Sequence, residues 1–383
     1  MNILNGQILN KKIIFVTGTR ADWGKLKSLI TETSSNMFDV YVFITGMHND
    51  AKYGDTYLDV QRIGGVKFYR FDNKTDETTM DLTVSKTIIG FSDYVDKIKP
   101  DLIVVHGDRP EPLACAIVGS FKNILVAHVE GGEVSGTIDE LIRHSISKLS
   151  HIHFVSNKKA KTRLIQMGEN SSSIFIIGSP DVDLMFSRDL PSIEDAREKY
   201  EIYFENYSIC LFHPVTTEIN YTKNQIDVLI NSLIESNKNY IIIYPNNDLG
   251  SNLIIESYRK INSKRIKILP SIRFEYFLTI LKNSDFIIGN SSAGIREAPY
   301  YSIYSINIGT RQNKRDVNKM ILSVDFNKEN ILKAIEKAEK KKNLITVKNF
   351  GLGKSSKKFI KVLANESFWE TNNQKEFHDI DVE

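Results

Sequence analysis

Short apolar runs rich in β-branched residues alternate with longer amphipathic segments along most of the sequence. Runs of this length and composition are typical of buried strands, and the segments between them have the periodicity of helices. In the first half we expect helices from about residue 25 and over residues 80–98. The expected strands there are residues 13–17, 40–45, 102–105, 124–129, 152–155 and 174–177. This alternation predicts a parallel sheet with crossover helices.

The same alternation restarts after a charged helical segment at residues 192–203. The strands expected in this second half are residues 208–212, 240–244, 266–269, 286–288 and 305–308. A chain of 383 residues is also too long for one ordinary domain. We therefore predict an α/β protein with two doubly wound Rossmann-like domains, residues 1–185 and 186–350, and a hinge near residues 180–191. A C-terminal segment, residues 351–383, begins with an amphipathic helix at 354–363 and is expected to be loosely held beyond about residue 365.

The composition excludes several classes of partner. With 50 basic and 47 acidic residues the net charge is +3, which does not provide the broad cationic surface of a nonspecific nucleic-acid binder. No apolar run is long enough to span a membrane, and the polar start of the chain lacks the apolar stretch of a secretory signal. Cys115 and Cys210 both lie in apolar runs, which argues against a disulfide framework. We therefore expect a cytoplasmic protein. We interpret the lysine-rich run at residues 337–342 as the solvated end of a helix.

Two clusters of charged residues follow neighbouring expected strands. Residues 106–109 read His-Gly-Asp-Arg, and residues 128–133 read His-Val-Glu-Gly-Gly-Glu. Parallel sheets bind ligands at the carboxyl ends of their strands, so both clusters lie where chemistry is expected. If Asp108, Glu130 and Asp139 converge, they could remove and return protons on a bound substrate. Helix capping and salt bridges to nearby arginines are the alternative.

The cluster around Glu130 also contains a partial metal-binding pattern. His128 and Glu130 have the His-x-Glu spacing of zinc deaminases, but no Pro-Cys-x-x-Cys follows. We therefore expect neither a catalytic metal nor any other cofactor.

A glycine-bearing loop at residues 18–25 follows the first strand and opens the first helix. Its sequence, Gly-Thr-Arg-Ala-Asp-Trp-Gly-Lys, places Arg20 and Lys25 where backbone amides and the helix dipole favour a phosphate. Five residues separate its glycines and Leu26 follows the lysine, so it is not a Walker loop, and the dinucleotide fingerprint is absent. An ordinary strand-to-helix turn explains this loop equally well.

Residues 289–297, Gly-Asn-Ser-Ser-Ala-Gly-Ile-Arg-Glu, could form a second phosphate-binding turn. Helix capping would explain Ser291 or Ser292, but it leaves the glycines, including Gly294, and the charged residues unexplained. Glu297 could accept hydrogen bonds from both ribose hydroxyls. Together with Arg311, these residues predict a nucleotide-binding half of the protein.

Polar side chains also follow the first two strands of the second domain. His213 is followed by a proline, and Asn246 lies in the turn after the next strand. A histidine held at a strand end is well placed to contact a phosphate, although most lone histidines are surface or internally satisfied residues.

Several phrases of the sequence, taken in order, resemble the hydrolysing UDP-N-acetylglucosamine 2-epimerases of sialic acid biosynthesis. They are Gly-Thr-Arg-Ala-Asp at 18–22, His-Gly-Asp-Arg at 106–109, Glu-Gly-Gly-Glu-Val-Ser-Gly-Thr-Ile-Asp at 130–139, Arg-His-Ser-Ile-Ser-Lys-Leu at 143–149, His-Pro-Val-Thr-Thr at 213–217, Gly-Asn-Ser-Ser at 289–292 and Gly-Thr-Arg-Gln at 309–312. The resemblance implies a fold like that of the B-type glycosyltransferases, with the substrate in the cleft between two domains. It also implies that the C-terminal helix packs back on the first domain and that the protein is a homodimer.

The resemblance further implies a reaction in two stages and a role for each site residue. A base removes the proton at carbon 2 while UDP departs by anti-elimination, and water then adds to the glycal to give N-acetylmannosamine. Asp108, Glu130 and Asp139 match the catalytic acids, although the step at which each acts stays open, and Arg143 and His144 are grouped with them. Arg20, His213, Ser291, Ser292, Glu297 and Arg311 match positions that hold UDP, and Arg109 matches the surroundings of the sugar and the diphosphate. From the motifs themselves we add Lys25, Asn246 and Gly294 to the expected binding residues for the UDP-sugar.

Three alternatives stay open. Related enzymes act on UDP- or GDP-linked N,N'-diacetylbacillosamine for legionaminic acid synthesis, and no residue decides the substituents at carbons 4 and 6. A glycosyltransferase of the same fold would use the nucleotide site in a similar way but would need an acceptor. A non-catalytic sensor is disfavoured, because three acids would weaken the binding of an anion.

Overall fold

A computed structural model describes residues 10–36, 38–75, 79–135, 137–187, 190–312, 319–340 and 349–379. The chain divides into two compact units. Unit 1 comprises Met1–Glu133, Asp139–Phe186 and Asn349–Glu383, and unit 2 comprises Val134–Ile138 and Ser187–Lys348. The polar start of the chain, residues 1–9, and two lysines of the run at 337–342, Lys341 and Lys342, lie outside the described residues. Each unit is described by itself.

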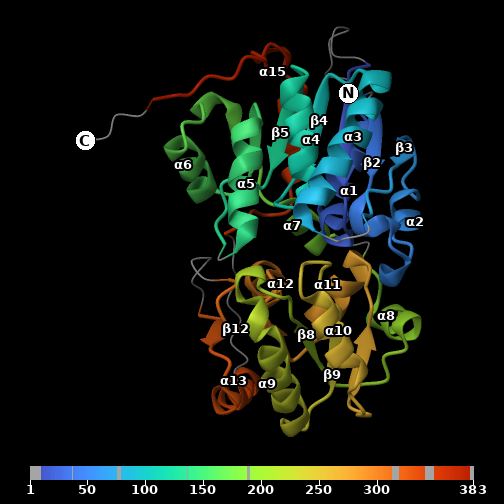
Figure 1. The fold of residues 1–383 in the computed structure, drawn as a ribbon, viewed down its shortest axis with the longest axis vertical. Helices are drawn as coiled ribbons and strands as arrows, with labels where there is room; N and C mark the ends of the chain where they lie inside the picture. Colours follow the sequence, from blue (N-terminus) through green and yellow to red (C-terminus); the bar gives the residue numbers. More distant parts are fainter. Residues whose placement is uncertain are drawn as a thin grey trace. The chain divides into compact units, whose positions relative to one another are not determined.

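Unit 1 is built on a seven-stranded parallel sheet in the order β3-β2-β1-β4-β5-β6-β7 (Figure 1). Its central strands are apolar along nearly their whole length and are buried, as expected for a sheet covered on both faces by helices. The strands are β1 Lys12–Thr17, β2 Asp39–Ile44, β3 Lys67–Arg70, β4 Leu102–His106, β5 Leu125–Val129, β6 Ile152–Val155 and β7 Ile174–Ile176.

The helices of unit 1 connect these strands and return from the end of the chain. They are α1 Arg20–Ser34, α2 Tyr57–Val60, α3 Met80–Ile98, α4 Pro110–Phe121, α5 Ile138–Leu149, α6 Lys158–Gln166, α7 Pro180–Met185, α14 Ser355–Leu363 and α15 Glu366–Trp369, with short 3-10 helices η1 Gly46–Asn49, η2 Ala51–Tyr53 and η3 Ser171–Ser173. Helix α5 begins one residue before the division between the units, so Asp139 and the rest of the helix belong to unit 1.

Unit 2 repeats this plan with a six-stranded parallel sheet in the order β10-β9-β8-β11-β12-β13. Its strands are β8 Ser208–Leu211, β9 Tyr240–Ile243, β10 Ile266–Leu269, β11 Phe286–Gly289, β12 Tyr304–Ile308 and β13 Ile321–Val324. Its helices are α8 Ile193–Tyr200, α9 Thr222–Glu235, α10 Ser251–Arg259, α11 Phe274–Lys282, α12 Ala293–Arg296 and α13 Lys328–Lys340, with η4 Thr216–Tyr221 and η5 Ala298–Tyr301. The predicted fold class, two doubly wound α/β units, is confirmed.

The order of the strands determines where ligands can bind. In unit 1 the chain winds outward from β1 in both directions, so β1 and β4 are neighbours although they are far apart in sequence. In unit 2, β8 and β11 are related in the same way. Loops diverge at the carboxyl ends of such strand pairs and leave room for a ligand. The charged loops of the sequence follow β1, β4, β5, β8 and β11.

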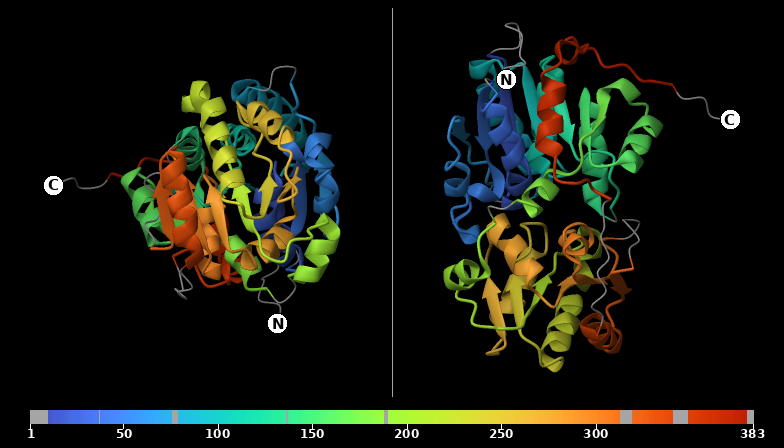
Figure 2. Two further views of the ribbon diagram at one scale, coloured as in Figure 1. Left: turned by 90° about the horizontal axis from the view of Figure 1, so that it is seen from below. Right: turned by 180° about the vertical axis from the view of Figure 1, so that it is seen from behind.

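Helix α14 packs into the core of unit 1. The ring of Phe359 lies 4.6 Å from Phe154 and 6.2 Å from Phe15, centroid to centroid. The view from behind in Figure 2 shows this C-terminal helix beside the sheet of unit 1. The expectation that the chain is loosely held beyond residue 365 is wrong for most of the described part, because α15 buries Phe368 and residues 373–378 make several hydrogen bonds to unit 1.

Two further observations concern the described residues as a whole. None of their helices combines the length and the apolar character needed to cross a membrane. Cys115 and Cys210 are both buried and carry free thiols.

Candidate active site

Asp22 shapes the loop between β1 and α1. Its carboxylate accepts hydrogen bonds from the backbone N–H groups of Gly18 and Thr19, both at 2.9 Å, and from the Thr17 hydroxyl at 2.7 Å. Thr19 caps α1 in return, so the loop is closed by a capping box. Arg20 is the first residue of the helix, and its Nη2 lies 3.1 Å from Oδ2 of Asp59. Sequence reasoning named Arg20 but missed Asp22, although the Thr-x-x-Asp spacing was a usable signal.

Glu130 directly follows β5 and has a left-handed backbone conformation, with φ +65°. Its N–H donates to the carbonyl of Phe154 at 2.9 Å, which holds this uncommon geometry in place. The carboxylate is 4% exposed. Its Oε2 accepts from Nε2 of His106 at 3.1 Å, and its Oε1 accepts from the Ser179 hydroxyl. The group is therefore a buried acceptor whose orientation is fixed by the protein.

Lys25 lies among the buried acids. Its Nζ is 3.2 Å from Oε2 of Glu130 and 3.4 Å from Oδ2 of Asp181. A buried carboxylate needs a nearby cation or donor, and Lys25 provides this charge for both acids. Sequence reasoning assigned Lys25 to the substrate and missed Ser179 and Asp181. Ser179 precedes α7 and Asp181 lies in its first turn. Neither belongs to a sequence motif that indicated a contact with the site.

Asp108 and Arg143 form an ion pair between the loop after β4 and helix α5. Arg143 is 3% exposed, and its Nη1 also donates to the carbonyl of Glu133 at 3.1 Å. Asp139 lies one helical turn before Arg143 and is buried as well, so both point from the same face of α5. The helix thus presents an acid and a cation from its first two turns.

His144 and Arg109 flank this group. Nε2 of His144 lies 3.8 Å from Glu140, one turn earlier on α5, and partial burial lowers the pKa of His144. Arg109 immediately precedes α4. Its backbone is extended, as is usual before a proline, and Pro110 is the first residue of the helix.

His128 is held on both sides of its ring within unit 1. Its Nε2 lies 2.8 Å from the carbonyl of Gly107 and its Nδ1 lies 3.0 Å from the hydroxyl of Ser147. A carbonyl only accepts, so Nε2 carries the proton and Ser147 donates to Nδ1. Burial lowers the pKa of His128 to about 3, which keeps the ring neutral. Across the described ranges, no group of three or more potential ligands is arranged to hold a metal ion.

Glu111, in the first turn of α4, is a second buried carboxyl that sequence reasoning did not assign to the site. A methyl group on Gly46 would lie 2.7 Å from its Oε1, and one on Gly18 would lie 3.4 Å from its Cδ. Its Oε2 is buried and has no hydrogen-bond partner among the residues described. Burial raises the pKa of Glu111, against the opposing effects of the Arg109 charge and a hydrogen bond from Asn73. The carboxyl therefore lies where the loops after three strands converge.

Asn290 organises the carboxyl edge of unit 2. Its side-chain amide accepts from the N–H of His213 at 2.7 Å and donates to the carbonyl of His213 at 2.8 Å. The ring of His213 accepts the N–H of Asn246 at Nδ1, at 3.1 Å. This hydrogen bond assigns the ring proton to Nε2, which makes His213 a donor suited to an anion. Sequence reasoning quoted Asn290 within a motif but gave it no role.

Arg311 follows β12 and also contacts Asn290. Its Nη1 donates to the carbonyl of Asn290 at 3.3 Å, and Gln312 donates to that carbonyl at 2.8 Å. Glu297 ends the short helix α12 and is buried. The loops after β8, β11 and β12 are thus joined at one point.

The serines and glycines after β11 have separate local explanations. Ser291 Oγ accepts from the N–H of Ala293 at 3.3 Å, whereas Ser292 makes no side-chain capping bond. Gly289 has φ +138°, and a methyl group there would lie 2.1 Å from the carbonyl oxygen of Leu211. A methyl group on Gly294 would lie 2.2 Å from the Ser305 hydroxyl. The close packing of β11 against β8 and of α12 against β12 therefore requires both glycines without any ligand.

A family model described as UDP-N-acetylglucosamine 2-epimerase matches residues 31–364. The UDP-N-acetylglucosamine 2-epimerase of Neisseria meningitidis serogroup B is 45% identical over 97% of this chain and 100% of its own length. The UDP-N,N'-diacetylbacillosamine 2-epimerase (hydrolyzing) of Legionella pneumophila is 35% identical over 92% of this chain and 95% of its own.

Solved structures show the same fold. A crystal structure of the Methanocaldococcus jannaschii UDP-GlcNAc 2-epimerase, in complex with UDP-GlcNAc and UDP, superposes with a TM-score of 0.79. The match covers 92% of this chain and 99% of that one, at 23% sequence identity.

Proposed function

The chain belongs to the UDP-N-acetylglucosamine 2-epimerase family, and from this premise we propose that it is a hydrolysing UDP-N-acetylglucosamine 2-epimerase. It converts UDP-N-acetylglucosamine and water into UDP and N-acetylmannosamine, a precursor for sialic acid. The observation that carries the proposal is the arrangement around Glu130, a buried carboxylate oriented by His106, Lys25 and Ser179. An anion-binding protein without proton chemistry would not gain from such an acid.

The reaction requires an acid–base group and a site for the leaving group. In the first step a base removes the proton at carbon 2, the bond from carbon 1 to the diphosphate oxygen breaks, and a double bond forms between carbons 1 and 2. UDP leaves and 2-acetamidoglucal remains. In the second step water adds its oxygen to carbon 1, and a proton returns to carbon 2 on the opposite face.

We assign the proton transfers to Asp108, Glu130 and Asp139, without dividing the steps among them. The burial of Glu130 and Asp139 and the ion pair that fixes Asp108 support this role, because positioned general acids and bases contribute about 10²–10⁴-fold to a rate. Arg143, which already pairs with Asp108, controls the charge and orientation of that acid. His144 is the residue after Arg143 on α5, and we group it with the three acids.

We assign the UDP group chiefly to the edge of unit 2. His213 offers a proton on Nε2, and Ser291 and Ser292 offer hydroxyls beside it in the loops joined by Asn290. Arg311 supplies positive charge for the departing diphosphate, and Glu297 supplies a carboxylate for the ribose hydroxyls. In unit 1, Arg20 and Arg109 belong to the loops that would meet the sugar and the diphosphate.

A second substrate is favoured by one observation. A relative 35% identical over most of the chain is named for the hydrolysis of UDP-N,N'-diacetylbacillosamine. The same acids and nucleotide site would serve that sugar, because it differs only at carbons 4 and 6. The family resemblance also leads us to propose a homodimer, and a single monomeric species in sedimentation velocity would contradict that assignment.

Proton NMR in deuterated water tests the function directly. Purified protein is incubated with UDP-N-acetylglucosamine, without acceptor, NAD or added metal. We expect UDP and N-acetylmannosamine carrying deuterium at carbon 2, and Asp139→Asn should abolish both signals. If UDP-N-acetylglucosamine stays intact, the same measurement is repeated with UDP-N,N'-diacetylbacillosamine. No turnover of either sugar, or turnover only with an acceptor, would refute the proposed hydrolysis.

A further inference from the structure

The end of the chain is fastened to the helix that carries Asp139 and Arg143. We propose that residues 373–378, the C-terminal strap, position α5 and the loop of Asp108, so that the strap controls turnover rather than nucleotide affinity. This inference rests on the proposed function for its activity readout. Its structural basis lies entirely within unit 1.

Lys375 is the main fastening of the strap. Its Nζ donates to the carbonyls of Ser147, Lys148 and Ser150 at 3.0, 2.8 and 2.7 Å. These carbonyls belong to the last turn of α5 and to the residue just beyond it, where the helix dipole favours a cation. A single side chain from the end of the sequence therefore caps the helix that presents two site residues from its opposite end.

A buried acid holds Lys375 in this position. Glu169 is 1% exposed, and its Oε2 lies 2.6 Å from Nζ of Lys375 and 2.9 Å from Nε2 of His153. Lys148 of α5 reaches Oε1 of the same acid at 2.8 Å. Burial opposes the charge of Glu169, but the hydrogen bond from His153 and these lysines outweigh it and lower the pKa to about 2. The strap and α5 thus share one buried counter-charge.

Contacts on both sides of Lys375 fix the rest of the strap. The carbonyl of Asn373 accepts from Nε2 of His151 at 3.0 Å, and its side chain donates to the carbonyl of Asn123 at 2.9 Å. Phe377 lies against Gly168, where a methyl group would come within 2.3 Å of its ring. The N–H of His378 donates to the carbonyl of Gly168 at 3.0 Å. The strap is therefore bound through its backbone as well as through one lysine.

A chain of buried hydrogen bonds leads from the strap to Asp108. Ser147, whose carbonyl Lys375 binds, donates its hydroxyl to Nδ1 of His128 at 3.0 Å. Nε2 of His128 donates to the carbonyl of Gly107 at 2.8 Å, one residue before Asp108. Arg143, on α5, completes the connection from the other side by pairing with Asp108. Arg143 is thus held by α5, which the strap contacts directly, and Asp108 follows the residue whose carbonyl ends the hydrogen-bond chain from the strap.

The experiment compares Lys375→Met with Lys358→Met, in which an exposed lysine of α14 is changed in the same way. We expect Lys375→Met to lower kcat about 10- to 100-fold, because small displacements of catalytic groups cost that much. KM and the Kd for UDP should stay within about twofold of the wild-type values. Lys375→Arg keeps the cation and its donors and should recover most of kcat. Lys358→Met should match the wild type.

Two further measurements separate positioning from loss of folding. Ser147→Ala leaves the carbonyl that Lys375 binds but removes the donor to His128, so its effect on kcat should not add to that of Lys375→Met. Hydrogen exchange should be faster in α5 and in the loop after β4 for both variants, whether or not a substrate is turned over. Unchanged kcat and unchanged exchange in Lys375→Met would overturn the proposal. An inactive wild type with faster exchange in the variant would instead refute only the proposed function.

Discussion

The carboxyl edges of the two sheets have the same position in the fold but different chemistry. At the edge of unit 1, the buried Glu130 and the partly buried Asp108 are held by the cations Lys25 and Arg143. At the edge of unit 2 the central residue is Asn290, a neutral amide that joins the loops through backbone groups. The edge of unit 1 holds paired acids and cations in fixed positions, whereas the loops at the edge of unit 2 are joined by the hydrogen bonds of a neutral amide.

This difference indicates how two copies of one architecture can divide a reaction. Proton transfer needs ionisable groups whose charge is controlled by burial and by close partners, which unit 1 has. Holding a diphosphate needs donors that are already oriented, which unit 2 has in His213 and Arg311. We therefore expect substitutions in unit 1 to act mainly on kcat and substitutions in unit 2 to act mainly on nucleotide affinity.

Glu130→Gln should have the largest effect on this comparison. The substitution keeps the size of the side chain and removes its capacity to exchange a proton. We expect kcat to fall about 10³-fold, with the Kd for UDP nearly unchanged. Steady-state kinetics and calorimetry with UDP measure the two quantities. Asp96→Asn, at an exposed carboxylate on α3, is the matched control and should leave both unchanged. A loss of UDP affinity as large as the loss of kcat would contradict the proposed division of roles between the two units.

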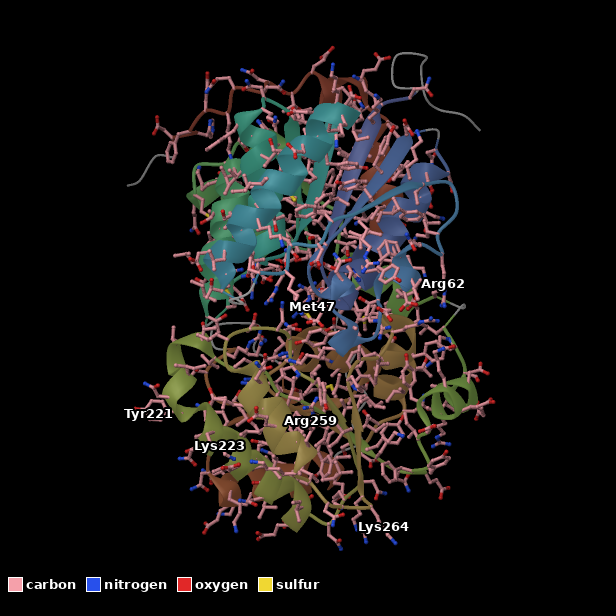
Figure 3. The ribbon with its side chains drawn as sticks, turned by 45° about the vertical axis from the view of Figure 1, so that its right-hand side comes forward. Met47, Arg62, Tyr221, Lys223, Arg259 and Lys264 are labelled. Carbon is pink, nitrogen blue, oxygen red and sulfur yellow. The ribbon has the colours of Figure 1, made fainter. Side chains whose placement is uncertain are left out.

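His213→Ala tests the other edge. The donor on Nε2 is lost, and hydrogen bonds to charged groups contribute about 1.5–3 kcal/mol, so the Kd for UDP should rise roughly 10- to 100-fold. Because the proposed interaction would also assist departure of the diphosphate, we expect some decrease in kcat. Tyr221→Ala is the control, since Tyr221 is 66% exposed and projects away from unit 2 in Figure 3. An unchanged Kd with a reduced kcat would place His213 with the catalytic groups.

The sequence predicted the parts of the site that depend on local order. The loops after β4 and β5 were identified because a strand pattern and a charged motif are adjacent in sequence, as at Asp108 and Glu130. Ser179 and Asp181 were missed because they reach Glu130 and Lys25, respectively, only when β7 is added to the sheet. The strap was missed for a similar reason, since Lys375 lies in a polar stretch where periodicity carries no signal. The edge strands β3 and β13 were missed because their residues are only partly buried.

Lys25→Met distinguishes two roles of one residue. The motif around residues 18–25 assigned Lys25 to the substrate, whereas its Nζ lies 3.2 Å from Glu130 and 3.4 Å from Asp181. If it orients the acid, kcat should fall about 10-fold while KM changes little. The variant should also be less stable, by about 3–5 kcal/mol, because two buried carboxylates lose their shared cation. Lys27→Met on the same helix is the control for a lysine change, and a rise in KM alone would restore the substrate role.

Glu111→Gln should have the smallest effect and the one that depends most on pH. Burial raises the pKa of Glu111, so the folded protein keeps its proton at pH values where the unfolded chain has lost it. The resulting stabilisation is complete below the unfolded pKa and is lost as pH rises through the folded one. Charged and titratable groups that act on the carboxyl or are acted on by it include Arg109, Asp22 and the buried thiol of Cys115. Glutamine cannot ionise, so this loss should be absent in the variant.

Thermal unfolding of both proteins between pH 5 and pH 9 measures this effect. At pH 9 we expect Glu111→Gln to unfold about 2–4 °C higher than the wild type, a change that corresponds to ~1 kcal/mol in a domain of this size. The difference should shrink as pH falls through the raised folded-state pKa of Glu111, because the wild-type carboxyl then regains its proton. Glu194→Gln, on α8 of unit 2, should show no such trend. A variant less stable than the wild type at every pH would mean that Glu111 is held as a carboxylate, and unit 1 would then carry one more fixed negative charge than we infer.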